Sequence, residues 1–280
     1  MKSILKTLRK KITLRKGIFY SLVEFYFSGI TPSSTGGQPV QLYYMTKDKI
    51  PIRKSYITLM LNTIYFKLIM LILGILALVF KSNYVFSNGF IYIFFFILGF
   101  IVDLVMVIMG MVLLFKQDLV KKLFLKIVSL CKKLKIFKKK FETMDTEDVM
   151  VRYRDEIIFV KSHKKVVFIN FIITVIQRLL LFSVAYVVYR AMGFSKYSYF
   201  DLLMLQVSVQ VAIEALPLPG GAGLSEGMLH NLFVILFASK LADVGMLLTR
   251  TFSFYIPLIV SGIIILIYNI VVKKNDETSQ

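Results

Sequence analysis

The chain has 280 residues, of which 57% are hydrophobic, and its mean hydropathy is +0.73. Soluble domains are about 45–50% apolar, so this composition excludes an ordinary soluble domain and indicates a membrane protein. The net charge of +19 is explained by basic cytoplasmic loops and anionic lipid headgroups rather than by a nucleic-acid partner. One cysteine and two separated histidines predict no disulfide and no metal site, and no motif predicts a cofactor.

Residues 1–16 carry seven Lys or Arg and no acidic residue, which predicts a basic cytoplasmic or interfacial segment. The apolar run Gly17–Ile30 is too short to span a bilayer. It is followed by the turn-forming stretch TPSSTGGQPVQ, Thr31–Gln41, and then by more basic residues. Because basic flanks favour the cytoplasmic side at both ends, we expect segment 17–45 to enter the membrane and return as a re-entrant hairpin.

Four apolar runs reach the roughly 20 residues needed to cross a bilayer. They are Tyr56–Phe80, Phe90–Phe115, Val166–Tyr189 and Phe252–Val272. Long continuous runs favour helices over the alternating strands of a barrel. With the less apolar segments Phe200–Leu216 and Met228–Leu248, they predict an all-α polytopic membrane protein with about 6–8 membrane segments.

Residues 116–165 form the longest hydrophilic stretch, with 15 Lys or Arg and seven Asp or Glu. Its basic and apolar residues alternate at helical spacing, which predicts an amphipathic insert on the cytoplasmic leaflet. The alternative is a solvated loop that only fixes orientation. The remaining expectation is a single membrane domain, residues 17–272, with a short cytoplasmic tail, residues 273–280.

A second set of turn-forming residues, PLPGGAGLSEG from Pro217 to Gly227, lies within the apolar region Phe200–Leu248. The charge bias places both ends of that region outside the cell. The sequence therefore predicts two broken hairpins that enter from opposite sides. Such a pair is typical of inverted-repeat transporters, and an inverted repeat is our hypothesis for this chain.

The first broken segment contains residues suited to a helix start. Pro32 ends a helix, Gly36 and Gly37 permit positive φ and close backbone approach, and the N-cap residue types Ser, Ser and Thr occupy positions 33–35. A helix from Gln38, and another that Ser225 caps, would aim N–H groups at an anionic headgroup. The alternative is that both motifs are tight turns that only pack helices.

Ionisable residues within apolar segments are costly and indicate a cavity or a partner. Arg178 lies in the middle of its segment and is our candidate for a phosphate contact. Glu214 and Glu226 bracket the second motif and are expected to pair with Arg178 or Arg250, or to hold a cationic group. For Lys67, Asp201 and Asp243 an interfacial position is favoured. The candidate headgroup path comprises Pro32, Ser33, Ser34, Thr35, Gly36, Gly37, Gln38, Arg178, Glu214, Pro219, Gly220, Gly221, Glu226 and Arg250. No catalytic constellation is present in the sequence.

The two motifs resemble the paired signatures of the lysylphosphatidylglycerol synthase transmembrane family. This is the flippase-like membrane region of the bacterial multiple peptide resistance factor. The resemblance covers residues 18–272. It includes the motif positions Pro32, Gly36, Gly37, Gln38, Pro219, Gly220, Gly221, Glu226 and Gly227.

The resemblance implies a multi-pass protein of the bacterial cell membrane that acts on anionic or aminoacylated phospholipid. In the full-length factor a C-terminal soluble domain transfers lysine from lysyl-tRNA to phosphatidylglycerol. The membrane part is associated with moving the product outward, which repels cationic antimicrobial peptides. This sequence departs from the pattern because it has no synthase domain after residue 272 and its N-terminus looks short.

Three interpretations follow from this comparison. The first is a lipid flippase, with a separate synthase domain or a second copy of the chain as possible partners. The second is a phosphatidylglycerol lysyltransferase, so whether the chain is an enzyme stays open. The third is a membrane scaffold whose basic segment recruits partners.

Overall fold

The computed structural model describes residues 12–116, 161–214, 223–237 and 241–277, together with the single positions 122, 126, 129, 154, 157 and 158. Within these residues all regular secondary structure is helical. The helices are α2 (Leu14–Ile30), α3 (Gly37–Lys47), α4 (Ile52–Ser87), α5 (Gly89–Phe115), α9 (Lys164–Ala191), α10 (Tyr199–Glu214), α11 (Leu224–Phe237), α12 (Ala242–Arg250) and α13 (Ile256–Glu277). Most of the predicted amphipathic insert, residues 116–165, lies outside the described residues.

Four helical stretches are long and apolar enough to cross a membrane. They are Ile52–Ser87, Gly89–Phe115, Lys164–Ala191 and Ala242–Val271. Each contains or overlaps one of the four predicted apolar spans, so the prediction of an all-α polytopic membrane fold is confirmed. The last span begins earlier than expected, because a π-helical turn at Thr251–Tyr255 joins α12 to α13 without a break.

The predicted ends of the chain also differ slightly from the helices. α2 begins at Leu14, inside the basic segment, where Thr13 caps it by accepting a hydrogen bond from the Lys16 backbone N–H at 3.3 Å. α13 continues to Glu277, so part of the expected tail is helical. Large apolar side chains on the outward faces of the spans, such as Phe90, Leu266 and Ile270, are exposed, as expected for surfaces that contact lipid tails.

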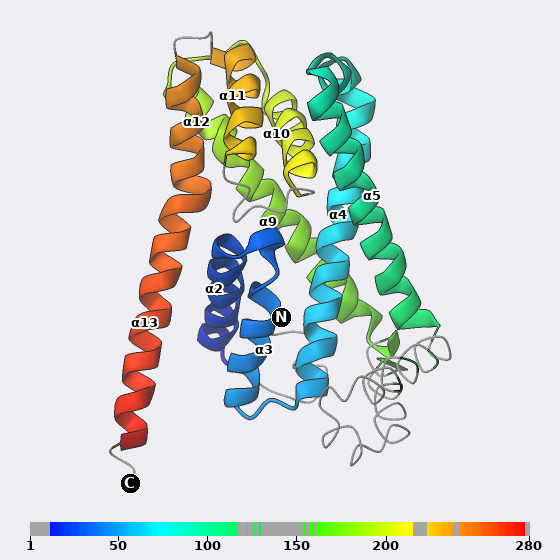
Figure 1. Ribbon diagram of the computed structural model, residues 1–280, viewed down its shortest axis with the longest axis vertical. Coiled ribbons are helices and arrows are strands. Elements are labelled where there is room, and N and C mark those ends of the chain that lie inside the picture. The colour runs from blue at the N-terminus through cyan, green and yellow to red at the C-terminus, as the bar shows by residue number, and fades with distance from the viewer. Residues whose placement is uncertain are drawn as a thin grey trace.

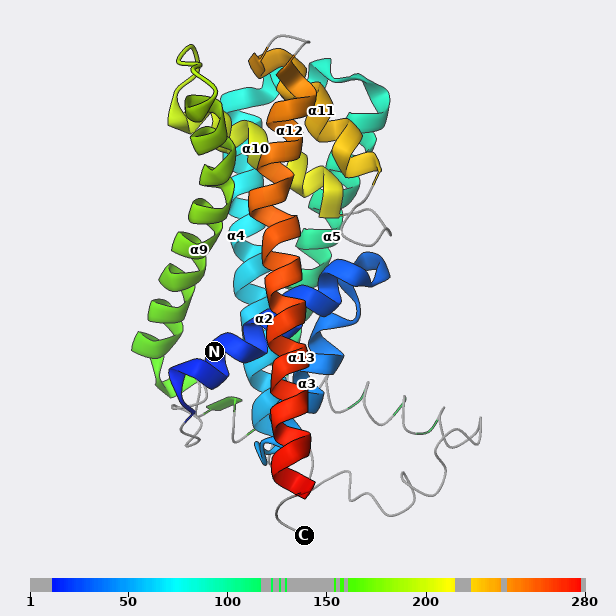
Figure 2. The same ribbon diagram turned by 90° about the vertical axis from the view of Figure 1, so that its left-hand side faces the viewer.

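The two predicted hairpins occupy opposite halves of the molecule. α2 and α3 lie in its lower half, and the turn between them faces upward (Figure 1). α10 and α11 lie in the upper half, and the end of α10 and the start of α11 point downward toward that turn in both side views (Figures 1 and 2). The broken segments thus approach one another midway along the spans.

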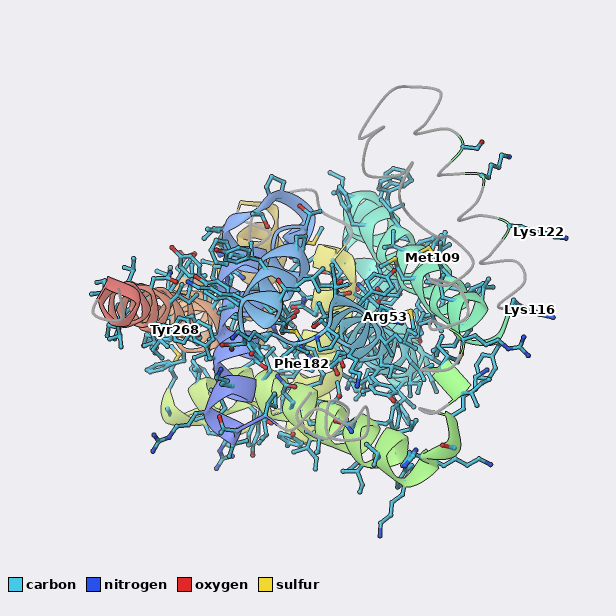
Figure 3. The ribbon with its side chains drawn as sticks, turned by 90° about the horizontal axis from the view of Figure 1, so that it is seen from below. Arg53, Met109, Lys116, Lys122, Phe182 and Tyr268 are labelled. Carbon is cyan, nitrogen blue, oxygen red and sulfur yellow. The ribbon has the colours of Figure 1, made fainter. Side chains whose placement is uncertain are left out.

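Basic residues gather at the lower end of the bundle. Seen from below, Lys116 and Lys122 extend away from the helices, and Arg53 lies at the start of α4 (Figure 3). The lower ends of α4, α5 and α9 lie next to basic residues, whereas the segment from Ser82 to Phe90, where α4 ends and α5 begins, contains none. This distribution matches a cytoplasmic lower face under the positive-inside rule.

Close helix packing holds the upper half together. Buried hydrophobic residues from α4, α5, α9, α10, α11 and α12 form one apolar core, in which Tyr189, Phe233 and Phe237 are fully buried. A Cβ on Gly99 of α5 would lie 1.9 Å from the carbonyl oxygen of Val211 in α10. Only glycine fits at this contact, and small residues of this kind let membrane helices approach closely.

A separate core joins the first hairpin to α13. It includes Phe19, Tyr20, Tyr44 and Met45, with Ile265 from α13. The ring of Phe19 stacks on Tyr268 with centroids 4.0 Å apart, and the Tyr44 hydroxyl lies 2.9 Å from Asn269 Oδ1. The first hairpin is therefore packed against the last span.

Candidate functional site

The turn of the first hairpin is closed by its own hydroxyl groups. The Thr31 hydroxyl donates to the Phe27 carbonyl at 2.5 Å and accepts from the Gly36 backbone N–H at 2.9 Å. The Thr35 hydroxyl donates to the Pro32 carbonyl at 2.9 Å. Pro32–Ser34, which includes Ser33, forms a single 3-10 turn. These bonds satisfy backbone groups that a bilayer interior would leave unpaired.

The expected capping scheme is wrong in this turn. α3 begins at Gly37 with Gly36 at its N-cap, and no side chain caps it. Neither glycine has a positive φ; that conformation belongs to Ser34, with φ of 54°. A Cβ on Gly37 would lie 2.1 Å from Ser28 Oγ and 2.6 Å from the Glu24 carbonyl oxygen. Glycine is therefore required for the close approach of α3 to α2.

Gln38, the next motif residue, ties the hairpin to the neighbouring span. Its side-chain amide donates to the Thr63 hydroxyl at 2.6 Å. Three residues further on, the buried Gln41 amide donates to the Tyr20 carbonyl at 3.0 Å. The first hairpin thus uses neutral hydrogen bonds both within itself and toward α4.

The second motif is described only at its C-terminal end. Pro219, Gly220 and Gly221 lie outside the described residues, as does the side chain of Ser225. Gly223, with φ of +84°, precedes α11 and donates its backbone N–H to the Glu226 carboxylate. A carboxylate at the third helical position that accepts from the N-cap N–H is one half of a capping box.

Glu226 also joins α11 to the last span. Its Oε1 accepts from Arg250 Nη2 at 3.2 Å and from the Tyr255 hydroxyl at 3.1 Å. The Arg250 guanidinium lies 4.7 Å from the Phe254 ring centroid. The expected pairing of Glu226 with Arg250 is present in the structure.

Glu214, at the end of α10, enters a different ion pair from the one expected. Lys67 Nζ on α4 lies 2.6 Å from Glu214 Oε2 and 2.6 Å from Asp103 Oδ1 on α5. The three side chains are 13%, 8% and 1% exposed in the order Lys67, Glu214, Asp103. The interfacial position favoured for Lys67 is therefore wrong: the lysine lies inside the bundle between two carboxylates.

Arg178 in the middle of α9 lies near this triad. Its guanidinium lies 4.2 Å from the Phe66 ring centroid, and it interacts electrostatically with Glu214 and with Glu24 of α2. Its Nε atom is buried and has no hydrogen-bond partner among the described residues. Five charged residues on five helices thus form one interior charge network, of which only Glu24 is exposed: Glu24, Lys67, Asp103, Arg178 and Glu214.

The other ionisable residues lie away from this network. His230 Nδ1 is 2.8 Å from Asp243 Oδ1, and both side chains are exposed. Asp201 pairs with Lys81 at the upper end of α4, where α4 is kinked. Asp201 also accepts from the Ser198 backbone N–H and hydroxyl, while its own N–H donates to the Ser198 hydroxyl. This is a complete capping box that the S-x-x-D spacing signalled and sequence reasoning missed.

A network of charged side chains inside a membrane protein can serve only a few functions. Interior charges in membrane proteins pair with one another or line the path of a polar substrate. Among the described residues no group of three His, Cys, Asp or Glu could hold a metal ion. Guanidinium, ammonium and carboxylate groups together suit a headgroup that carries both phosphate and amine.

Fold and site together define a polytopic α-helical membrane protein in which two opposed broken hairpins meet around buried charges. The family model described as "Lysylphosphatidylglycerol synthase TM region" matches residues 1–261. The chain belongs to this family, which is named for lysylphosphatidylglycerol synthesis. No match was found among curated proteins or among solved structures.

Proposed function

We propose that the protein translocates an anionic or aminoacylated phospholipid, such as lysylphosphatidylglycerol, between the leaflets of the bacterial cell membrane. The observation that carries the proposal is the interior charge network, which lies where the two hairpins meet. Family membership supports a phospholipid as the substrate. A network of opposite charges costs free energy in a membrane interior, and ionisable residues at such positions mark substrate or ion pathways.

The interior charges and the apolar outer faces together suit a polar path for the headgroup with the acyl tails left in the bilayer. Arg178 has an unsatisfied buried Nε and would bind the lipid phosphate, since guanidinium groups match phosphate geometry. Glu24 has solvent-accessible surface although protein surrounds it, so it would face the same path and attract an amine. The apolar outer faces of the spans would leave the acyl tails in the bilayer. Under this proposal the basic lower face is cytoplasmic.

The family description also supports a second function. A membrane region of lysylphosphatidylglycerol synthase would contribute to phosphatidylglycerol lysyltransferase activity, alone or with a separate synthase domain. Either activity would provide resistance to cationic antimicrobial peptides, because more lysyl-lipid in the outer leaflet makes the surface more positive.

One expression experiment separates these functions. The chain is expressed, with and without a separate soluble synthase domain, in cells that make no lysyl-lipid. Total lysylphosphatidylglycerol is quantified, and its outer-leaflet fraction is measured with an impermeant amine-reactive label. We expect total lipid to depend on the synthase and outer exposure to depend on this chain. Lysyl-lipid made by this chain alone would contradict the proposal and establish a transferase.

Two variants of α9 test the role of the site in the same assay. Arg178→Gln removes the guanidinium from the interior charge network. Arg190→Gln removes an arginine at the exposed end of the same helix and serves as the matched control. We expect outer exposure of lysyl-lipid to fall at least tenfold for Arg178→Gln and to stay unchanged for Arg190→Gln. Equal exposure in both variants at equal expression would contradict a headgroup path through Arg178.

A further inference from the structure

The interior charge network is not electrically balanced. Its buried centre is one ammonium, Lys67, between two carboxyl groups, Asp103 and Glu214. Arg178 interacts with Glu214 but also with Glu24, which is exposed. If both buried carboxyl groups were ionised, Lys67 alone would form ion pairs with them at close range. An uncompensated charge in a low-dielectric interior is strongly unfavourable, and such a group normally becomes neutral instead.

Two unsatisfied oxygen atoms show where the excess charge lies. Asp103 Oδ2 and Glu214 Oε1 are buried and have no hydrogen-bond partner among the described residues. The other oxygen of each carboxyl group lies 2.6 Å from the same Lys67 nitrogen. Because both carboxyl groups contact one nitrogen at 2.6 Å, they lie close to each other and interact electrostatically. One ammonium therefore faces two carboxyl groups that are close enough to influence each other.

A single proton resolves both problems. A protonated carboxyl group becomes a hydrogen-bond donor, so an unsatisfied oxygen on one residue gains a hydrogen to offer to the other. The proton also removes the excess negative charge. Two carboxyl groups held close together cannot both ionise readily, which is the arrangement that retains a shared proton.

A metal ion does not fit as well as a proton. Calcium-type cations take about six or more oxygen ligands. The described groups that interact with this pair are instead cationic: Lys67 on α4 interacts with both carboxyl groups, and Arg178 on α9 interacts with Glu214. The side chains of Asp103 and Glu214, 1% and 8% exposed, also leave little space for a hydrated ion.

We propose that Asp103 and Glu214 share one exchangeable proton, and that a headgroup ammonium displaces this proton as the lipid passes. The proton leaves the carboxyl oxygen for water, the carboxylate stays behind, and the ammonium takes over its charge balance. Lipid movement would then be coupled to proton movement in the opposite direction. This exchange rests on the proposed function, whereas the proton site itself does not.

Infrared spectroscopy tests the proton site without any transport assay. The C=O band of a protonated carboxyl group is separate from the bands of a carboxylate. We expect purified protein in detergent to show this band at neutral pH and to lose it in alkaline solution. Asp103→Asn and Glu214→Gln should each remove the carboxylic acid band. Asp201→Asn, which removes a carboxylate that Lys81 already keeps ionised, should leave the band unchanged.

Two results would overturn the proton site. One is the absence of a carboxylic acid band at neutral pH in the folded wild-type protein. The other is a band that persists in both Asp103→Asn and Glu214→Gln. Because each substitution is nearly isosteric, one folded variant suffices for the comparison.

A second measurement tests the exchange. Lysylphosphatidylglycerol is added to the protein in weakly buffered detergent, and proton release is followed with an indicator dye. We expect about one proton released per protein, and none with phosphatidylglycerol, which carries no ammonium. A carboxylic acid band without proton release would contradict the exchange and leave the proton site intact. If a variant lost lipid transport but kept the carboxylic acid band and proton release, the result would concern the proposed function and not the proton site.

Discussion

The two broken hairpins do the same architectural task with different chemistry. The turn of the α2–α3 hairpin is closed by neutral groups, with Thr31 at its centre and Gln38 bonded to α4. An ion pair between Lys16 and Asp48 joins the opposite ends of these two helices. The hairpin of α10 and α11 is anchored by carboxylates. Glu214 pairs with Lys67 and Glu226 pairs with Arg250. At its turn the first hairpin depends on close packing, whereas the second hairpin depends on charge.

This difference indicates how each hairpin would respond to change. Neutral hydrogen bonds and tight backbone contacts are insensitive to pH and to a neighbouring charge. Ion pairs in the interior hold their position only while each charge keeps its partner. We infer that the turn of the first hairpin is a fixed part of the path, and that the second hairpin is the part whose position a charged headgroup or a proton can alter.

The largest effect is expected at Lys67. Lys67→Met leaves Asp103 and Glu214 without their shared cation, and breaking a buried ion pair costs about 3–5 kcal/mol. Thermal unfolding in detergent, followed by circular dichroism, measures the loss. Adding Asp103→Asn and Glu214→Gln to the same protein should restore much of the stability. Lys81→Met is the matched control, because its partner Asp201 is 29% exposed. An equal loss in the two lysine variants would contradict the difference between interior and peripheral pairs.

The next largest effect is expected from overpacking the hairpin of α2 and α3. Gly37→Ala places a Cβ against Ser28 and the Glu24 carbonyl, and overpacking of this kind costs about 1–3 kcal/mol. Gly227→Ala is the control in the second hairpin, where a Cβ would meet nothing within 4 Å. Replacing a helical glycine there should be neutral or stabilising by up to about 1 kcal/mol. Unfolding temperatures in detergent compare the two. A larger loss for Gly227→Ala would reverse our assignment of packing to the first hairpin.

A smaller effect is expected where charge joins α11 to the last span. Glu226→Gln keeps the shape of the side chain but removes its negative charge from Arg250. Hydrogen bonds to charged groups contribute about 1.5–3 kcal/mol, and we expect the lower value because Glu226 is 25% exposed. Amide hydrogen exchange should increase in α11 and not in α3. Faster exchange in α3 alone would show that the two hairpins are not held independently.

The sequence predicts the spans and the hairpins much better than it predicts the partners of the charges. Length and hydropathy are local properties, so Phe90–Phe115 and Val166–Tyr189 could be read directly, and turn-forming residues identified both breaks. Lys67 was misplaced because its position depends on Asp103 and Glu214, which reach it from helices far away in the chain. The role of Gly37 was likewise misread, since the requirement for glycine comes from a contact with α2 and not from its own dihedral angles.

The smallest effect concerns the entry of the charged hairpin, where Asp201 caps α10. Hydrogen bonds from Lys81 and Ser198 lower the pKa of Asp201 to about 2, against an ordinary value of about 3.9. Because the folded-state pKa is depressed, the stabilisation is present above pH 4 and is lost as the pH falls toward 2. Asp201→Asn should therefore destabilise the protein by about 1 kcal/mol or less at neutral pH. It should also flatten the fall in stability between about pH 4 and 2. Unfolding temperatures measured across this range compare the variant with the wild type. If the unfolding temperatures of both proteins fell equally between about pH 4 and 2, the acid sensitivity would not come from Asp201. Glu226 would then be the next carboxylate to substitute.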